Sequence, residues 1–319
     1  MRKRKSITRV LLDDAREYFQ KYSNDETRKA YTNNYKKYIK YCRDNFDCRS
    51  KDECGKHIQE YSDYLQKQGY TASTIHAYLA SVCNYHSVNM NKIKKPRRHT
   101  AEYTRGRGSY KNSNLSGDFD NPKFARIVRF QTIVGVRRAE LKRLKGSDFV
   151  CDESGFPCVQ IRRGKGGKFH LQRLVGTAEE IEFVRNCFKN SAENDYIFSR
   201  SEYKNKLNFH YLRAKVAQRA YAYYVNRINA EGEAYIKELE AQVRARWDKY
   251  NVNPETGKAK YFPRNLIEGK YYLRGKNRQF AVENGLAVEY SKLALFAVNV
   301  LHLSHWRNDV GVESYMLVV

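Results

Sequence analysis

The chain has 319 residues, which is long enough for two domains of ordinary size. Sixty lysines and arginines against 35 aspartates and glutamates give a net charge of +25, which favours a polyanionic partner over a merely soluble basic protein. No apolar run has the length of a membrane span, and no apolar core follows the basic start of the chain. We therefore expect a cytoplasmic protein with no signal peptide and no membrane partner.

The seven cysteines form no Cys-x-x-Cys pair. Cys48, Cys54 and His57 are close in sequence, but a fourth ligand at zinc spacing is missing. We expect reduced thiols, no metal and no cofactor.

Residues 1–90 have the periodicity of helices. Ser23 and Glu26 form a predicted capping box, with Ser23 at the N-cap, and tyrosines then recur at helical spacing. Thr71 is the predicted cap of a second clear helix. We expect residues 1–95 to form an N-terminal helical domain.

A basic linker is predicted over 96–120. Residues 91–111 contain a single acid, Glu102, and their proline and glycines break any helix. The segment either follows a DNA backbone or is a solvated tether between domains. The candidate DNA-binding residues are Lys92, Lys94, Lys95, Arg97, Arg98, Arg105 and Arg107.

Helical spacing returns over 121–145, and two alternating segments around 159–161 and 171–175 then predict a β-hairpin. Its turn reads Gly-Lys-Gly-Gly and contains Lys165. The stretch 207–249 is predicted to be long and helical, with a break at Gly232.

Three motifs in this second half carry residues suited to phosphoryl transfer. Residues 134–141 read Val-Gly-Val-Arg-Arg-Ala-Glu-Leu, residues 271–275 read Tyr-Tyr-Leu-Arg-Gly, and residues 305–315 run from His-Trp-Arg to Glu-Ser-Tyr. In this order they resemble the tyrosine recombinases, the phage-integrase family, which cut and rejoin DNA through a phosphotyrosine.

The resemblance implies a mostly α fold with a small β-sheet. An N-terminal helical core-binding (SAM-like) domain would precede an α+β tyrosine-recombinase catalytic domain over 121–319. The stretch 207–249 looks like a helical insertion relative to compact members of the family, and no role is assigned to it.

Two arginines are candidates for neutralising charge on the attacked phosphorus. A guanidinium presents a rigid fork that binds two oxygens, and Arg137 and Arg274 lie in the matched motifs. Glu140 is expected to hold the local backbone or an arginine in place. Arg138 is expected to point away, because adjacent helical residues differ by about 100° in direction. Arg278 is the alternative to Arg274, because the residues after Arg274 depart from the family's pattern.

The candidate nucleophile is Tyr315, a phenol that needs a base or positive charge nearby to react at neutral pH. The resemblance places His305 beside the phosphate, with a spacing to Tyr315 that is one residue longer than usual; His302 is the alternative. Tyr271 stands where the family's His-x-x-Arg motif has histidine. Tyrosine can donate a hydrogen bond to phosphate, but it is a poor base.

Lys165 is the candidate general acid. In the family, the lysine of a Gly-Lys-Gly turn between two strands protonates the leaving 5′ oxygen, a role that a lowered pKa would favour. Lys168 is the alternative, and both lysines could simply contact phosphates.

The function implied by the resemblance is site-specific DNA recombination, for integration or excision of a bacterial mobile element. Double-stranded DNA would be the partner, with monomers assembling into a tetramer on two sites and with accessory DNA-bending or excisionase factors. Two alternatives remain: a type IB topoisomerase-like enzyme, and a catalytically silent DNA-binding protein.

Overall fold

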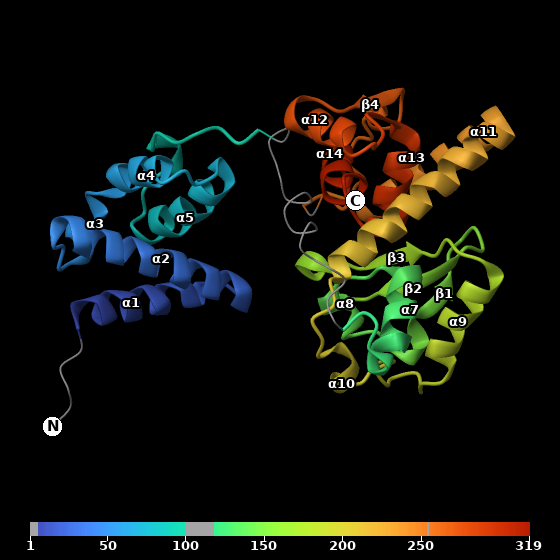
Figure 1. Ribbon diagram of the computed structural model, residues 1–319, viewed down its shortest axis with the longest axis horizontal. Helices are drawn as coiled ribbons and strands as arrows, with labels where there is room; N and C mark the ends of the chain where they lie inside the picture. The colour runs from blue at the N-terminus through green and yellow to red at the C-terminus, as the bar shows by residue number, and fades with distance from the viewer. Residues whose placement is uncertain (1–5, 100–117, 254) are drawn as a thin grey trace. The chain divides into compact units, whose positions relative to one another are not determined.

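The computed structural model describes residues 6–99, 118–253 and 255–319 (Figure 1). The chain divides into two compact units, Met1–His99 and Thr100–Val319. The fold is mostly helical with a small β component, as the sequence predicts. Most of the predicted linker lies outside the described residues, and with it the candidate DNA contacts Arg105 and Arg107.

The first unit is helical. Its elements are α1 (Ile7–Tyr18), η1 (Phe19–Lys21), α2 (Asp25–Phe46), α3 (Lys51–Gly55), α4 (Ile58–Lys67), α5 (Ala72–Tyr85) and η2 (Met90–Lys92). Helix α2 packs against α1 and α5, and α4 packs against α5. Much of the core is aromatic, so several of the chain's many tyrosines stabilise this unit by packing.

The helix caps of this unit agree with the sequence at one position and differ at another. Thr71 caps α5 as predicted, because its side chain accepts the backbone N–H of Thr74. The capping box at Ser23 is wrong. Asn24 is the N-cap of α2, and its side chain accepts the N–H groups of Glu26 and Thr27. Asparagine caps as well as serine does, so the adjacent residue can take the position.

The second unit contains two small antiparallel sheets. Strands β1 (Phe149–Cys151), β2 (Pro157–Ile161) and β3 (His170–Arg173) form one, and β4 (Lys270–Tyr272) and β5 (Glu289–Ser291) form the other. Ile161 pairs with His170, so β2 and β3 are the predicted hairpin and Lys165 lies in its turn.

Short helices and one long helix surround these sheets (Figure 1). They are η4 (Pro122–Phe124), α7 (Ala125–Val134), α8 (Arg138–Leu141), η5 (Gly146–Asp148), η6 (Lys165–Gly167), α9 (Ala178–Lys189), α10 (Arg200–Tyr203), α11 (Phe209–Tyr250), η7 (Arg264–Leu266), α12 (Gly275–Glu283), α13 (Lys292–Ala297), η8 (Val298–Leu303), α14 (Asn308–Gly311) and η9 (Val312–Met316). The helical periodicity expected over 121–145 is interrupted at Gly135, where the backbone turns left-handed with φ 62°.

Helix α11 is the central element of this unit. It spans 42 residues and packs against α7, α13, η8 and η9. The stretch 207–249 therefore contributes to the core of this unit, and its being an insertion relative to compact members of the family stays a prediction. The predicted break occurs at Gly232, whose φ of 61° and ψ of −140° favour glycine. Within the described residues, no helix is both long enough and apolar enough to cross a membrane.

Candidate active site

Arg137 is positioned by the turn between α7 and α8. It is the N-cap residue of α8, and its backbone N–H donates to Oε2 of Glu140 at 3.0 Å. Its Nη1 donates to Oε1 of the same carboxylate at 2.6 Å. Burial alone would raise the pKa of Glu140, but the guanidinium groups of Arg213 and Arg137 lower it overall. An ionised Glu140 therefore holds both the backbone and the side chain of Arg137.

Arg137, His305 and Tyr315 form a row of hydrogen-bonding groups. Nη2 of Arg137 lies 3.2 Å from Nε2 of His305, and that nitrogen lies 3.3 Å from the Tyr315 hydroxyl. The backbone N–H of His305 donates to the carbonyl of Asn299 at 2.8 Å, which fixes the histidine after η8. The sequence-predicted Arg137, Glu140, His305 and Tyr315 thus lie together.

His305 is neutral at physiological pH. Burial lowers its pKa to about 3, and the positive charges of Arg137, Arg213 and Lys165 act in the same direction. A neutral imidazole has one nitrogen able to accept a proton. His305 can therefore accept a hydrogen bond from the Tyr315 hydroxyl, but a pKa of about 3 makes the imidazole a weak base.

A buried arginine, Arg213, completes the surroundings of the Tyr315 hydroxyl. It lies on α11 with 1% of its surface exposed. Its Nε donates to the Tyr315 hydroxyl at 3.3 Å, and Nη2 donates to the carbonyl of Leu303 at 3.0 Å. Nη1 donates to the carbonyl of Gly135 at 2.7 Å and to Oε1 of Gln172 at 3.1 Å. These bonds fix the guanidinium beside the phenol oxygen.

Arg213 was not predicted from the sequence, although a signal was present. Residues 210–213 read His-Tyr-Leu-Arg, which is the usual His-x-x-Arg form. The ring of His210 lies 5.4 Å from the ring of Tyr315, edge-on. The motif was overlooked because the stretch 207–249 was assigned to an insertion.

Tyr271 and Arg274, the residues chosen for that motif, lie elsewhere in the unit. Tyr271 is in β4, and Arg274 is the exposed N-cap residue of α12. Both line a pocket of about 330 Å³ that also includes Glu313. Burial raises the pKa of Tyr271 to about 12, and the carboxylates of Asp309 and Glu313 contribute. In the described part of the chain, the side chains that contact the Tyr315 hydroxyl are those of Arg213 and His305. A catalytic role for Tyr271 and Arg274 therefore stays a prediction.

Lys165 is exposed in the hairpin turn. Its charge is among those that lower the pKa of His305, which places its ammonium group near the site. The role of Lys165 as the general acid stays a prediction, with Lys168 as the alternative.

Arg138, which was expected to point away from the site, and His302, the alternative to His305, both have structural partners. Arg138 donates to the carbonyls of Tyr203 and Leu207, and its guanidinium lies 4.1 Å from the centre of the Phe209 ring. His302 is buried 2.9 Å from the hydroxyl of Tyr224. Arg278, the alternative to Arg274, is exposed on α12.

The described residues of the basic segment differ in the exposure of their side chains. Lys92, Lys94, Arg97 and Arg98 are exposed. Lys95 is half-buried, and its ammonium group donates to the carbonyls of Met90 and Ile93. Lys95 therefore stabilises a turn, whereas the exposed four are available to a phosphate backbone.

No family model matches this chain, and no curated protein matches it. Among solved structures, the chain is similar to one titled "Crystal structure of XerA recombinase". The match has 18% sequence identity and a TM-score of 0.23, and it covers 65% of this chain and 82% of that chain. This structural neighbour is a recombinase.

Proposed function

We propose that the protein is a site-specific DNA recombinase (integrase) that cleaves and rejoins DNA through a 3′-phosphotyrosine, for integration or excision of a mobile element. The observation that carries the proposal is the convergence of Arg213 and His305 on the hydroxyl of Tyr315, with the guanidinium of Arg137 beside His305. These groups supply what attack on a phosphodiester requires: a nucleophile, a base and fixed positive charge.

The proposed reaction exchanges one phosphate ester for another. The Tyr315 oxygen forms a bond to the phosphorus and its proton passes to His305, whose pKa the negative charge of the bound phosphate raises, while the bond from phosphorus to the 5′ oxygen breaks. Arg137 and Arg213 stabilise the charge on the non-bridging oxygens, and Lys165 protonates the leaving 5′ oxygen. A 5′ hydroxyl of another strand reverses these steps. Each step replaces one phosphate ester by another, so the energy of the ester is conserved and the chemistry requires neither a metal ion nor ATP.

The burial of Tyr315 bears on how DNA reaches it. The side chain is 3% exposed, and Nε2 of Gln218 on α11 donates to its backbone carbonyl at 3.0 Å. In the proposed reaction, DNA binding moves the segment around Tyr315 enough for a phosphate to contact the phenol.

The decisive experiment is covalent trapping on a nicked DNA substrate that releases a short strand after cleavage. The wild-type chain should form an adduct that survives denaturing electrophoresis, with mass spectrometry locating the phosphate on Tyr315. Tyr315→Phe should form no adduct while DNA binding changes by less than a few-fold. Tyr272→Phe, at an exposed tyrosine, is the matched control and should react as wild type does.

Adduct formation by Tyr315→Phe would overturn the proposal and point to another tyrosine. Relaxation of supercoiled DNA that carries no paired sites would instead favour the topoisomerase-like alternative.

A further inference from the structure

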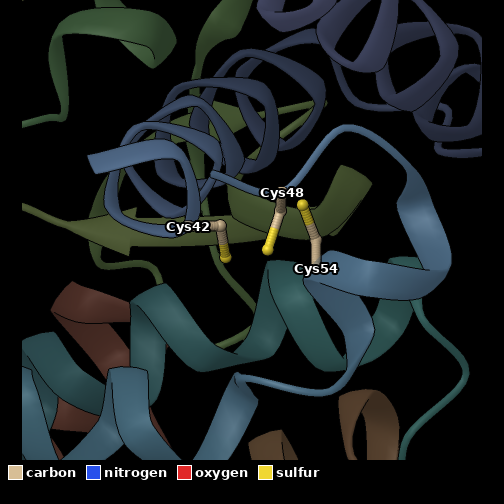
Figure 2. A group of neighbouring side chains, drawn as sticks. All are labelled: Cys42, Cys48 and Cys54. Carbon is tan, nitrogen blue, oxygen red and sulfur yellow. The ribbon is translucent and has the colours of Figure 1, made fainter. Parts of the chain in front are cut away.

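Three cysteines of the first unit converge in its core. Cys42, Cys48 and Cys54 are spaced six residues apart, and their sulfur atoms all lie within 4.8 Å of one another. All three are buried and none is in a disulfide. Figure 2 shows the three side chains beside one another, each from a different segment of the chain. Cys42 comes from α2, Cys48 from the connection after it, and Cys54 from α3.

The backbone of this region fixes all three side chains. Helix α2 is capped at its C-terminus by Asp47, which is left-handed with φ 46°, and the N–H of Cys48 then donates to the carbonyl of Cys42 at 3.4 Å. A capping box between Ser50 and Glu53 starts α3 directly afterwards. The chain therefore turns back so that Cys54 reaches the other two sulfurs.

We propose that Cys42, Cys48 and Cys54 bind a thiophilic d¹⁰ cation, Zn²⁺ or Cu⁺, through three thiolates. Soft sulfur ligands select these ions, and a zinc–sulfur bond of about 2.3 Å separates the sulfurs of a tetrahedral site by roughly 3.8 Å. Since the observed separations extend no further than 4.8 Å, rotation of the side chains is sufficient to close the site. This proposal replaces the expectation of no metal.

The membership of the cluster explains why the sequence did not reveal it. Cys48 and Cys54 were considered together with His57, but the ring of His57 stacks on Phe46 with centroids 3.7 Å apart. The third ligand of the group is Cys42, which lies on the preceding helix. Evenly spaced cysteines from a helix, a turn and a second helix match no familiar zinc spacing.

The cluster also differs from an ordinary buried cysteine in the same core. Three sulfur atoms lie together in the cluster, whereas Cys83 is not a member of it. Metal binding requires several thiolates on one ion, so only sulfurs that lie together can form the site. Cys83 is buried outside the cluster and is the matched control.

The experiment measures metal bound to the full-length chain. Reduced, metal-free protein is incubated with Zn²⁺ or, anaerobically, with Cu⁺, and is then exchanged into metal-free buffer. The bound metal is measured by inductively coupled plasma mass spectrometry. We expect close to one ion per chain, protection of three thiols from a thiol reagent, and a thiolate-to-metal charge-transfer band with Co²⁺ in place of Zn²⁺. Preference between Zn²⁺ and Cu⁺ identifies the ion.

The variants are Cys42→Ser, Cys48→Ser, Cys54→Ser and Cys83→Ser. The first three should each retain less than about a fifth of the wild-type metal, whereas Cys83→Ser should retain all of it. Wild-type protein that retains no ion, or equal loss in Cys83→Ser, would overturn the proposal. If a cluster variant does not fold, thiol protection and the Co²⁺ spectrum of the wild-type chain decide instead. None of these measurements involves DNA, so the result is independent of the proposed recombinase activity.

Discussion

A single buried arginine organises the candidate site. Arg213 donates four hydrogen bonds, which reach the turn after α7, strand β3, the end of η8 and the nucleophile candidate Tyr315. Removing a charge from water is costly unless its donors are paired, and here the partners lie on elements far apart in sequence. The position of Arg213 is therefore an outcome of the folded unit, and it delivers a fixed charge to the phenol.

The first prediction compares arginines at three positions. Arg213→Lys should lower the single-turnover rate of adduct formation by at least about 10²-fold, because lysine cannot present a rigid fork to two oxygens. Arg274→Lys should lower it by less than tenfold. Arg246→Lys tests for a general effect of burial, since Arg246 is also a buried arginine of α11 but donates to the carbonyl of Leu171 at 2.9 Å.

If Arg274→Lys were inactive in adduct formation and Arg213→Lys were active, the functional motif would be the one at 271–274. Comparable loss in Arg213→Lys and Arg246→Lys, with matching falls in melting temperature, would show that the rate reports on folding.

The second prediction concerns stability in acid. Burial lowers the pKa of His302 to about 3, whereas an unfolded chain has a histidine pKa of about 6.5. Between these values the unfolded state binds a proton that the folded state does not, so stability is complete above pH 6.5 and falls as the pH decreases toward 3. The loss from this histidine between pH 7 and pH 5 should be about 2 kcal/mol.

Urea unfolding at pH 7 and pH 5 tests this for wild type and His302→Gln. Glutamine can still hydrogen-bond the hydroxyl of Tyr224 but does not titrate, so the variant should lose about 2 kcal/mol less on acidification. Equal losses in the two proteins would contradict the prediction.

At the scale of elements, local sequence patterns predicted the hairpin, the helices and the break at Gly232. These features depend on hydrophobic periodicity and on the conformational freedom of glycine, which both involve only a few neighbouring residues. Arg213 belongs to a His-x-x-Arg motif at 210–213 and Arg274 to a Tyr-x-x-Arg motif at 271–274, but neither motif states which arginine lies beside Tyr315. That choice depends on the packing of α11 against α7 and η9. The cysteine cluster was missed for the same reason, since its members come from three segments.

The third prediction tests the close approach of α7 to α11. A Cβ on Gly135 would lie 3.1 Å from Cα of Arg213 and 3.0 Å from Cβ of Val216, and its φ is 62°. Gly135→Ala should therefore displace Arg213, lowering the rate of adduct formation by at least about tenfold and stability by more than the 1–2 kcal/mol of a left-handed alanine.

The control is Gly155→Ala, at a glycine with φ 75° and no atom within 4 Å of the added Cβ. It should carry the backbone cost alone and leave the rate of adduct formation unchanged, as measured by thermal melting and single-turnover assays. A Gly135→Ala protein that cleaves at the wild-type rate would show that the approach of the two helices does not position Arg213.

At the scale of the whole molecule, the dominant property is the net charge of +25. Charge of this size attracts a polyanion at long range, but only side chains that contact phosphates release counterions. The exposed basic residues that follow α5 are candidates for such contacts, whereas the ammonium group of Lys95 is bonded to backbone carbonyls. Each exposed basic residue carries the same charge as Lys95. The difference is that the Lys95 side chain is bonded within the protein, whereas the exposed side chains extend into solvent.

The last prediction uses that difference. If the protein neutralises on the order of 8 phosphates, its DNA affinity should fall with salt along a log–log slope near −7. Replacing Arg97 and Arg98 together by alanine should reduce the slope by about 2, because each lost phosphate contact removes about 0.9. Lys95→Ala should leave the slope unchanged while lowering the melting temperature, since its donated bonds stabilise a turn. Fluorescence anisotropy over a range of salt concentrations measures all three proteins. A wild-type slope around −2 would mean that most of the charge lies on surfaces that do not contact DNA. A double variant with the wild-type slope would show that Arg97 and Arg98 do not contact DNA.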